Sequence, residues 1–308
     1  MTTQIIDVKW RETSQPHNYE SGLTVWPDGS DTELFVPLDT GRQISWLIRG
    51  PRKCIGTRGL KGTMTRCPER SMVRPSFTQC GPCKALDEMN ACIRCTGSVC
   101  QASEERALDC SKAAYVLYLT VFGEDLIKVG VSTYGRMMVR WLEQGADFGV
   151  KLAKIQGGRL ARRIEDRISR SRDFAKAVRA ERKTGVLDRT IDYTRAQQNV
   201  SRVLKPGFVE TYLTADGVTV EEWPPPVTEL SSFYRLQSLD SPAQLLKSKI
   251  PPEGLVLLGE VVGLKGPLLV VRQQTTFRVA NLKSFVGYTL EERYNIEMND
   301  QAALSEYL

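Results

Sequence analysis

The cysteines carry the clearest chemistry in this 308-residue sequence, because all eight of them fall within residues 54–110. The centre of that block reads CGPCKALDEMNACIRC and holds two Cys-x-x-Cys pairs, Cys80/Cys83 and Cys92/Cys95. Each pair can place two sulfur atoms on one ion, and four thiolates in a tetrahedron are the usual ligands of structural zinc. The spacing therefore predicts that these four residues bind Zn²⁺, which would fold a lobe too small to have much core of its own.

Other interpretations of the cysteines stay open. An iron–sulfur cluster takes the same four thiolates, and a lobe without metal is the third alternative. Cys54, Cys67, Cys100 and Cys110 could supply a second ion, replace a ligand or be small buried residues. The N-terminal stretch MTTQIIDVKWRET has no basic segment followed by an apolar core, so neither a signal peptide nor a disulfide framework is expected. No apolar run of about 18 residues is present. We expect a cytoplasmic protein without a membrane partner.

A second stretch with chemical potential is KVGVSTYGRMMVRW, from Lys128 to Trp141. Arg136 and Arg140 are four residues apart and share one helix face, where two guanidinium groups can hold a phosphate. The alternative is an ordinary solvated face. Gly130 either permits a close backbone approach or is a turn glycine. Trp141 either belongs to the core or stacks on a nucleic-acid base.

The charge is unevenly distributed along the chain. The net charge is +6, yet residues 151–205 alone hold 16 Lys and Arg against 6 Asp and Glu. Such a surplus is typical of a surface that binds a polyanion, although a solvated helix face would also explain it. His17 is the single histidine, so a mechanism that needs a histidine base or ligand is nearly excluded.

The elements that must position these residues suggest an α+β protein. Alternating apolar residues and turn signals predict antiparallel strands in residues 22–67 and again in residues 254–288. Between them, residues 113–182 predict a hairpin, a short helix, a third strand and a long helix with an apolar stripe from Leu160 to Val178. A short helix is expected at Pro242–Leu246, between Pro-rich linkers, and a helical or loose tail after Arg293.

The expected organisation has four parts. They are a β-rich N-terminal region (1–67), a cysteine-rich zinc lobe (68–110), a small α/β module with its basic helix (111–205), and a linker with a β-rich C-terminal region (206–308). The two β-rich regions would frame the lobe and the module. The oligomeric state stays open.

Residues 113–172 resemble a divergent module of the GIY-YIG nuclease superfamily. In that family a first hairpin carries two short tripeptides, the next helix an arginine and a later helix a glutamate that binds a metal ion. Here the first tripeptide corresponds to Val116-Leu117-Tyr118, or to Leu117-Tyr118 with its apolar neighbours, and the second to Lys128-Val129-Gly130. The helix arginine corresponds to Arg140, or to Arg136 in an alternative register, and the glutamate to Glu165 in ARRIEDRI.

The resemblance implies a role for each of these residues. Arg140 would hold the scissile phosphate, Glu165 would bind Mg²⁺ or Mn²⁺, and Tyr118 would handle a proton. Active members have a tyrosine where this chain has Lys128, which could replace it as a base if burial lowered its pKa, or contact a phosphate. The predicted nucleic-acid contacts are Arg136, Arg140, Arg162 and Arg163.

Most of the chain also resembles an uncharacterised family that joins such a module to a cysteine-rich lobe. The stretches KVGVS, RWLEQGA and GLKGPLLV carry this resemblance. Together, these features predict a protein that acts on DNA or RNA, as a metal-dependent phosphodiester-cleaving nuclease. The alternatives are an inactive zinc-containing binding module and an RNA-modifying enzyme that uses Cys54 or Cys110.

Overall fold

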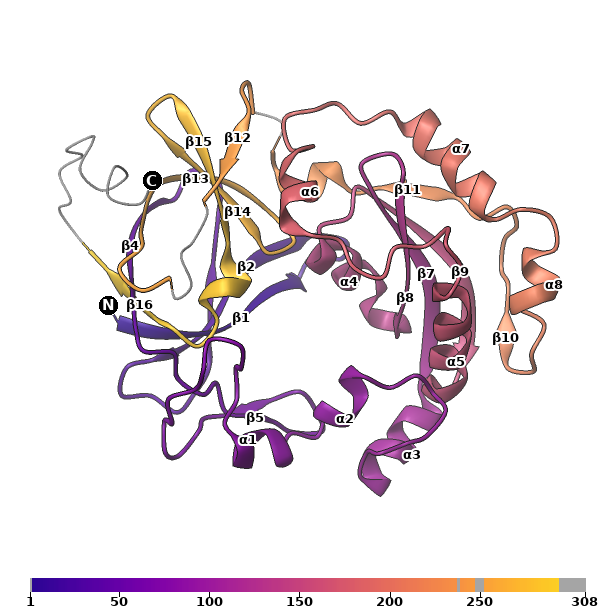
Figure 1. Cartoon of the computed structure of the whole chain (residues 1–308), viewed down its shortest axis with the longest axis horizontal. Helices are drawn as coiled ribbons and strands as arrows, with labels where there is room; N and C mark the ends of the chain where they lie inside the picture. Colours follow the sequence, from indigo (N-terminus) through magenta and orange to yellow (C-terminus); the bar gives the residue numbers. More distant parts are fainter. Residues whose placement is uncertain (1, 237–238, 247–251, 294–308) are drawn as a thin grey trace.

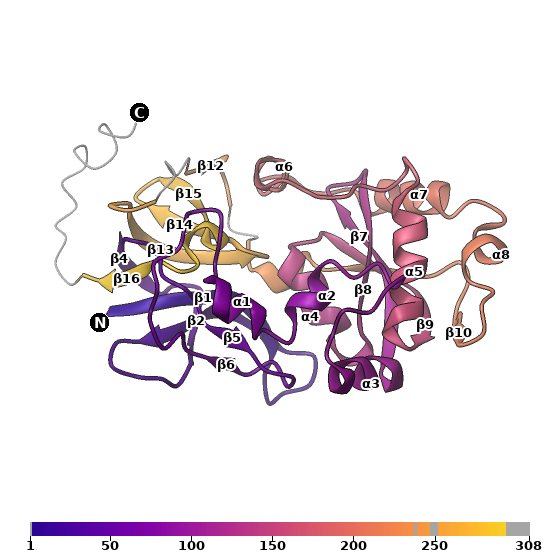
Figure 2. The same cartoon turned by 60° about the horizontal axis from the view of Figure 1, so that its bottom comes forward.

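The computed structural model describes residues 2–236, 239–246 and 252–293, so the tail expected after Arg293 lies outside the described residues. Figure 1 shows three parts, which we call the frame, the cysteine lobe (residues 52–112) and the module (residues 113–229). The frame and the module lie side by side, and the lobe crosses below them from one to the other (Figures 1 and 2). The mixed architecture confirms the predicted α+β class.

The frame is one nine-stranded sheet to which both ends of the described chain contribute. Its order is β12-β15-β14-β13-β4-β16-β1-β2-β3. Antiparallel β16 fits between β4 and β1, so the N-terminal and C-terminal β regions share one sheet and one core. The bounds of the frame strands are β1 (Thr2–Glu12), β2 (Tyr19–Pro27), β3 (Leu34–Pro37), β4 (Gln43–Arg49), β12 (Ala243–Leu245), β13 (Val256–Lys265), β14 (Leu268–Gln273), β15 (Thr276–Asn281) and β16 (Thr289–Glu292).

The cysteine lobe consists of short elements held together by turns. Strands β5 (Thr57–Arg58) and β6 (Met64–Thr65) form a small hairpin, and helices α1 (Gly81–Ala85), α2 (Asn90–Ile93) and α3 (Glu104–Lys112) follow. Asp87 is buried and ties the lobe together, because its carboxylate accepts the backbone N–H groups of Arg58 and Met89. The apolar cluster among its described residues consists of the buried Cys54, Cys67 and Cys83 with the partly buried Cys80 and Val73, so the lobe has little apolar core.

The module is built on a second antiparallel sheet of order β10-β9-β7-β8, with β11 also paired to β9. Leu117, Leu119 and Val121 of the central strand β7 pack into a core beneath α5 and α7, whereas Val116 and Tyr118 pack toward α4 and the frame. The bounds are β7 (Ala114–Phe122), β8 (Leu126–Thr133), η1 (Tyr134–Arg136), α4 (Met137–Gln144), β9 (Phe148–Gln156), α5 (Gly158–Ser169), α6 (Ala180–Thr184), α7 (Tyr193–Val203), α8 (Phe208–Tyr212), β10 (Val218–Thr219) and β11 (Val227–Glu229).

Two of the predicted helices differ from the structure. The long helix ends at Ser169, because Phe174 is buried in the module core and the N–H of Ala175 donates to the carbonyl of Ile127 beside β8. Residues 243–245 form strand β12, parallel to β15, where a helix was expected. In both segments contacts with distant strands override the local pattern.

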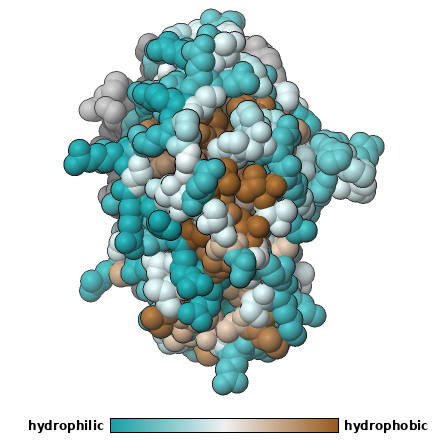
Figure 3. Space-filling view, turned by 90° about the vertical axis from the view of Figure 1, so that its right-hand side faces the viewer, coloured by the Kyte–Doolittle hydropathy of each residue, from teal (hydrophilic) through white to brown (hydrophobic). Residues whose placement is uncertain are grey.

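The outer face of the module carries a gathering of apolar side chains near its centre, over β10 and α8 (Figure 3). Partly buried residues of this region, including Val209, Val218 and Val220, pack against the module core from outside. Among the described residues, no helix combines the length and the apolar character that a membrane crossing requires.

Candidate active-site cleft and metal centre

A group of four cysteines forms a candidate metal centre in the lobe. The sulfur atoms of Cys54, Cys67, Cys80 and Cys83 all lie within 4.8 Å of one another. The hairpin β5–β6 brings Cys54 and Cys67 together from its two ends, while Cys80 directly precedes α1 and Cys83 lies in its first turn. Such a group of four thiols fits one tetrahedral ion such as zinc.

This arrangement corrects the predicted ligand set. Cys80 and Cys83 belong to the group, but Cys92 and Cys95 do not; within the described chain their places are taken by Cys54 and Cys67. The reason is the turn at Asp87, which carries the chain away from α1, so that Cys92 and Cys95 face a different cleft.

The electrostatics of the group suit a bound cation. Burial raises the pKa of Cys54 and of Cys83, so neighbouring thiols cannot all ionise without a counter-charge. Burial alone would also raise the pKa of Cys67, but the N–H of Ser71 and the neighbouring thiols lower it to about 7. Backbone N–H groups of Gly56 and Cys80 point at the Cys54 sulfur over 3.4 and 3.2 Å, which favours a thiolate there.

The candidate catalytic residues line a cleft of about 420 Å³ between the lobe and the module. Tyr118, Lys128, Arg140 and Glu165 are all part of its wall, although they come from β7, β8, α4 and α5. The predicted contacts Arg136 and Arg162 line it as well. Arg163 is exposed on α5 and is not among the lining residues; it packs against the lobe at Gly97.

A close contact explains why position 130 holds a glycine. Gly130 pairs with Tyr118 across the β7–β8 hairpin, and a Cβ atom at Gly130 would lie 2.6 Å from the phenol ring. Trp141 is fully buried and meets the Tyr118 ring edge to face, at 6.1 Å between centroids. Of the two interpretations of Trp141, the structure therefore supports the core residue.

Gln144 connects the two candidate proton-transfer groups. Its Nε2 donates to Tyr118 Oη over 2.9 Å, and its Oε1 accepts a hydrogen bond from Lys128 Nζ over 3.0 Å. Burial raises the pKa of Tyr118, so the phenol is protonated at neutral pH. Burial lowers the pKa of Lys128, and Arg140 lowers it further, although Glu165 opposes this.

The two helix arginines are held together by one carboxylate. Arg136 Nη2 and Arg140 Nη1 donate to the two oxygens of Glu143 over 3.1 and 2.5 Å, and the Glu143 side chain is only 13% exposed. Glu143 therefore fixes both guanidinium groups on one helix face and neutralises part of their charge. Sequence reasoning missed Glu143 and Gln144; the signal was their position in the helix, one turn after Arg140.

Glu165 is paired within its own helix. Arg162 Nη1 donates to Glu165 Oε2 over 2.8 Å, and both side chains are partly exposed to the cleft. No other carboxylate lines the described cleft, and Glu165 is not part of a group of three or more close metal-ligating side chains among the described residues.

The lobe contributes the opposite wall. Arg58 and Arg106 line it, together with the thiols of Cys92, Cys95 and Cys110. Tyr115 Oη donates to Cys110 Sγ over 3.5 Å. Close packing requires glycine beside this pair, since a Cβ at Gly158 would lie 2.5 Å from the Cys110 sulfur.

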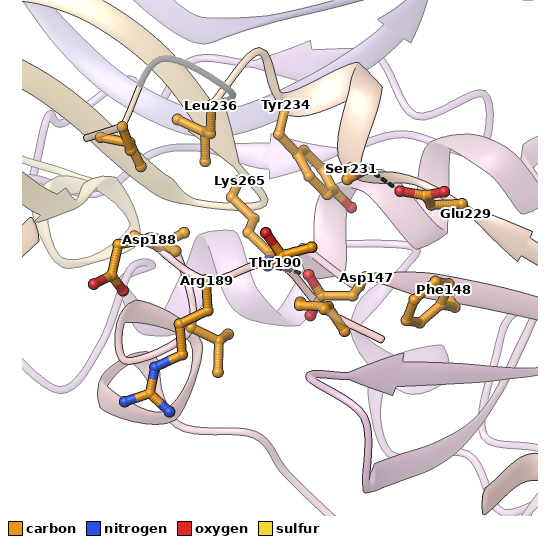
Figure 4. Close-up of a pocket in the computed structure, with 14 residues that line it drawn as sticks. Asp147, Phe148, Asp188, Arg189, Thr190, Glu229, Ser231, Tyr234, Leu236 and Lys265 are labelled. Carbon is orange, nitrogen blue, oxygen red and sulfur yellow. Dashed lines mark hydrogen bonds and ion pairs between the residues drawn. The ribbon is translucent and has the colours of Figure 1, made fainter. Parts of the chain in front are cut away.

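A second cavity, of about 340 Å³, lies at the junction between module and frame, and Figure 4 shows the side chains around it. Lys265 points at Asp147 and forms an ion pair with it, with both side chains at most 5% exposed. The other Asp147 oxygen accepts the N–H of Gly123 over 2.7 Å.

The backbones of the module and the frame meet beside this ion pair. A Cβ at Gly266 would lie 2.7 Å from the nitrogen of Gly145, directly after α4. The stretches RWLEQGA and GLKGPLLV thus meet here. This junction fixes α4, and with it Gln144, on the frame.

Comparison with known proteins gives one result. A family model described as "Protein of unknown function (DUF2797)" matches residues 41–290. No curated protein and no solved structure matches the chain. The matched region contains the cysteine group, the whole cleft and the junction between module and frame.

Proposed function

Because the chain belongs to the DUF2797 family, whose description names no activity, we propose a function from the cleft itself: the protein binds DNA or RNA there and hydrolyses a phosphodiester bond with Mg²⁺ or Mn²⁺. One observation carries the proposal. Tyr118, Lys128, Arg140 and Glu165, spread over 48 positions of the sequence, line a single cleft.

The charge of the cleft suits a phosphate backbone. Its described lining holds one carboxylate, Glu165, and six cations, namely Arg58, Arg106, Lys128, Arg136, Arg140 and Arg162. Since they come from both walls, a strand passing between lobe and module would meet cations on either side. Arginine forks bind phosphate oxygens in pairs, and six cations on two walls can neutralise several phosphates of one strand, which favours this ligand over a single small anion.

The hydrogen bonds around Gln144 suggest how protons would move. A neutral Lys128 can donate to Gln144 Oε1 and still use its lone pair to accept a proton from the attacking water. The oxygen of that water then bonds to phosphorus as the bond to the leaving oxygen breaks. Because Tyr118 Oη accepts a hydrogen bond from Gln144, its own proton can be donated to the leaving oxygen, which departs as a hydroxyl group. The proton that Lys128 has taken up then restores the phenol through solvent.

A divalent ion fits the cleft only together with substrate. Glu165 supplies one carboxylate, and Arg162 already donates to one of its oxygens. Mg²⁺ commonly binds through one or two carboxylates and the phosphates of the substrate, so Glu165 is an adequate protein ligand. The ion would polarise the phosphoryl group.

The cysteine group would hold a structural zinc ion. The proposed compartment is the cytoplasm, where the eight free thiols stay reduced.

The test is a cleavage assay on single- and double-stranded DNA and RNA with Mg²⁺ or Mn²⁺. Glu165→Gln should abolish cleavage while binding persists, because binding depends on the arginines. Asp166→Asn is the matched control, since Asp166 is the next residue of α5 and pairs with Arg170. Cys110→Ser in the same assay tests the alternative in which a cleft thiol does the chemistry. Cleavage that survives in Glu165→Gln contradicts the proposed metal site.

The second candidate function is binding without cleavage. Two observations favour it. Lys128 stands where active members of the GIY-YIG superfamily, which this region resembles, have a tyrosine. In addition, Arg162 donates a hydrogen bond to one of the two Glu165 oxygens that would bind the metal ion. In that case wild-type protein binds nucleic acid in a salt-dependent manner and cuts none of the substrates with either metal.

A further inference from the structure

A groove of about 490 Å³ lies on the cysteine lobe beside the cleft. Residues 76–79 before α1, the helix α2 and the segment 94–101 form most of its wall. The described lining contains two cations, Lys84 and Arg94, and no carboxylate. The groove is therefore positively charged, like the cleft.

The apolar side chains of the groove are unusually exposed. Phe77 is 50% exposed, Ile93 70% and Val99 69%. Isolated exposed apolar residues are common, but here three of them line one groove. They offer flat apolar contact area to a ligand that carries apolar faces.

Four of the longer polar side chains of the groove are available for a ligand. Within the described chain, the amides of Asn90 and Gln101 and the charged groups of Lys84 and Arg94 form no side-chain hydrogen bond or ion pair. Gln79 differs, because its amide donates to the carbonyl of Gly56 and to Asp87.

The groove continues the cleft. Ile93 and Cys95 line both. The segment 94–101 is attached to the module, because Arg159 at the start of α5 donates to the carbonyl of Ser98 over 2.8 Å. A Cβ at Gly97 would lie 2.2 Å from the carbonyl oxygen of Arg159, so loop and helix are in direct contact. The helix α5 also carries Arg162 and Glu165, which line the cleft. The same helix therefore fixes the position of the groove relative to the cleft.

We propose that this groove binds unpaired bases of the nucleic-acid strand whose backbone lies in the cleft. Phe77, Ile93 and Val99 would contact base faces, and Asn90 and Gln101 would meet base edges. Lys84 and Arg94 would hold the phosphates of these unpaired nucleotides, where the strand leaves the cleft. The inference rests on the proposed function and narrows its substrate to nucleic acid with a single-stranded segment. Paired bases hide their faces in the stack, so a duplex cannot use the apolar part of the groove.

The test compares the affinities of labelled single-stranded and duplex oligonucleotides of one sequence, as DNA and as RNA, by fluorescence anisotropy. Phe77→Ala should weaken single-strand binding about 5- to 100-fold, the range typical of a lost aromatic stacking contact. The double variant Ile93→Ser/Val99→Ser should weaken it as well, because both apolar contact surfaces are removed. Duplex binding should not change. Leu108→Ser is the matched control, since Leu108 is 53% exposed on the same lobe but does not line the groove. Zinc content of each variant reports whether the lobe is intact.

The outcomes separate the two proposals. If Arg136→Ala/Arg140→Ala weakens binding of both forms while the groove variants bind single strands like wild type, the groove inference is overturned and the cleft proposal stands. If the groove variants alone weaken single-strand binding and the cleft variant has no effect, the cleft proposal fails. Equal wild-type affinity for single strands and duplexes also overturns the groove inference.

Discussion

The phenol ring of Tyr118 lies directly over Gly130, its partner across the β7–β8 hairpin. The ring occupies the space that a side chain at position 130 would need. This contact places the hydroxyl group of Tyr118 beside Gln144 and inside the cleft. The glycine of the second tripeptide is therefore required by the tyrosine of the first.

We expect Gly130→Ala to destabilise the protein by about 1–3 kcal/mol, because the new methyl group must displace the ring or the strand. Urea unfolding measures this loss. Gly135→Ala is the matched control, since nothing lies within 4 Å of a Cβ at that position. Equal stabilities of the two variants would contradict the contact.

Cysteine variants distinguish the metal ligands that the structure indicates from those that the Cys-x-x-Cys spacing predicts. Cys54→Ser and Cys67→Ser should lose the metal ion, whereas Cys92→Ser and Cys95→Ser should retain about one zinc per chain. Elemental analysis of protein purified without added metal measures both. The reverse pattern would restore the predicted set, and iron with acid-labile sulfide would identify a cluster instead.

Glu143 should weaken the binding of nucleic acid. Glu143→Gln removes the negative charge that Arg136 and Arg140 share, so we expect tighter binding at low salt. The plot of log affinity against log salt concentration should become steeper by ~0.9, which corresponds to one more phosphate contact. Binding titrations at several salt concentrations measure the slope. Glu124→Gln, which removes a carboxylate paired with Arg195 outside the cleft, should leave the slope unchanged.

Lys183 should make stability depend on pH. Burial, and then the charges of Lys283, Lys128 and Lys265, lower the pKa of Lys183 to about 8 in the folded protein, against 10.5 as its ordinary value. Between these values the unfolded chain binds the extra proton, so the free energy of unfolding rises with pH from about 8 toward 10.5. Below pH 8 the charged lysine opposes folding.

Replacing Lys183 should therefore stabilise the protein most at neutral pH. Lys183→Met should raise the melting temperature at pH 7 and lose this advantage by pH 10, even though the hydrogen bond to the Gln144 carbonyl is removed. Lys176→Met is the control, because Lys176 is exposed. A constant difference between the Lys183 variant and wild type from pH 7 to 10 would rule out the titration.

The sequence predicted the module best, because its signals are local. The hairpin, α4 and β9 follow from the local pattern of apolar residues, and the structure contains all three. Tyr118, Lys128, Arg140 and Glu165, which were chosen from the resemblance, line one cleft in the structure, while their predicted roles stay predictions. Gln144 was not predicted, since an amide becomes a connecting group only when two strands and a helix converge on it.

Features that depend on distant contacts were missed. The partners of Cys80 and Cys83 are 13 or more residues earlier in the chain, and they approach because Gly59 and Gly62 turn the β5–β6 hairpin between them. The glycines around that hairpin were the available signal. Likewise, Ala243–Leu245 is a strand only because β15 is beside it.

The position of β16 in the frame has a consequence for synthesis of the chain. The sheet of the module is complete once Glu229 has been made, and its strands β7, β8 and β9 pair over short sequence distances. The frame cannot close until β16, at Thr289–Glu292, inserts between β1 and β4, more than 200 residues after they are made. On the ribosome the module can therefore fold first. Until β16 is made, β1 and β4 each lack a partner strand, and a chaperone would need to cover these unpaired edges.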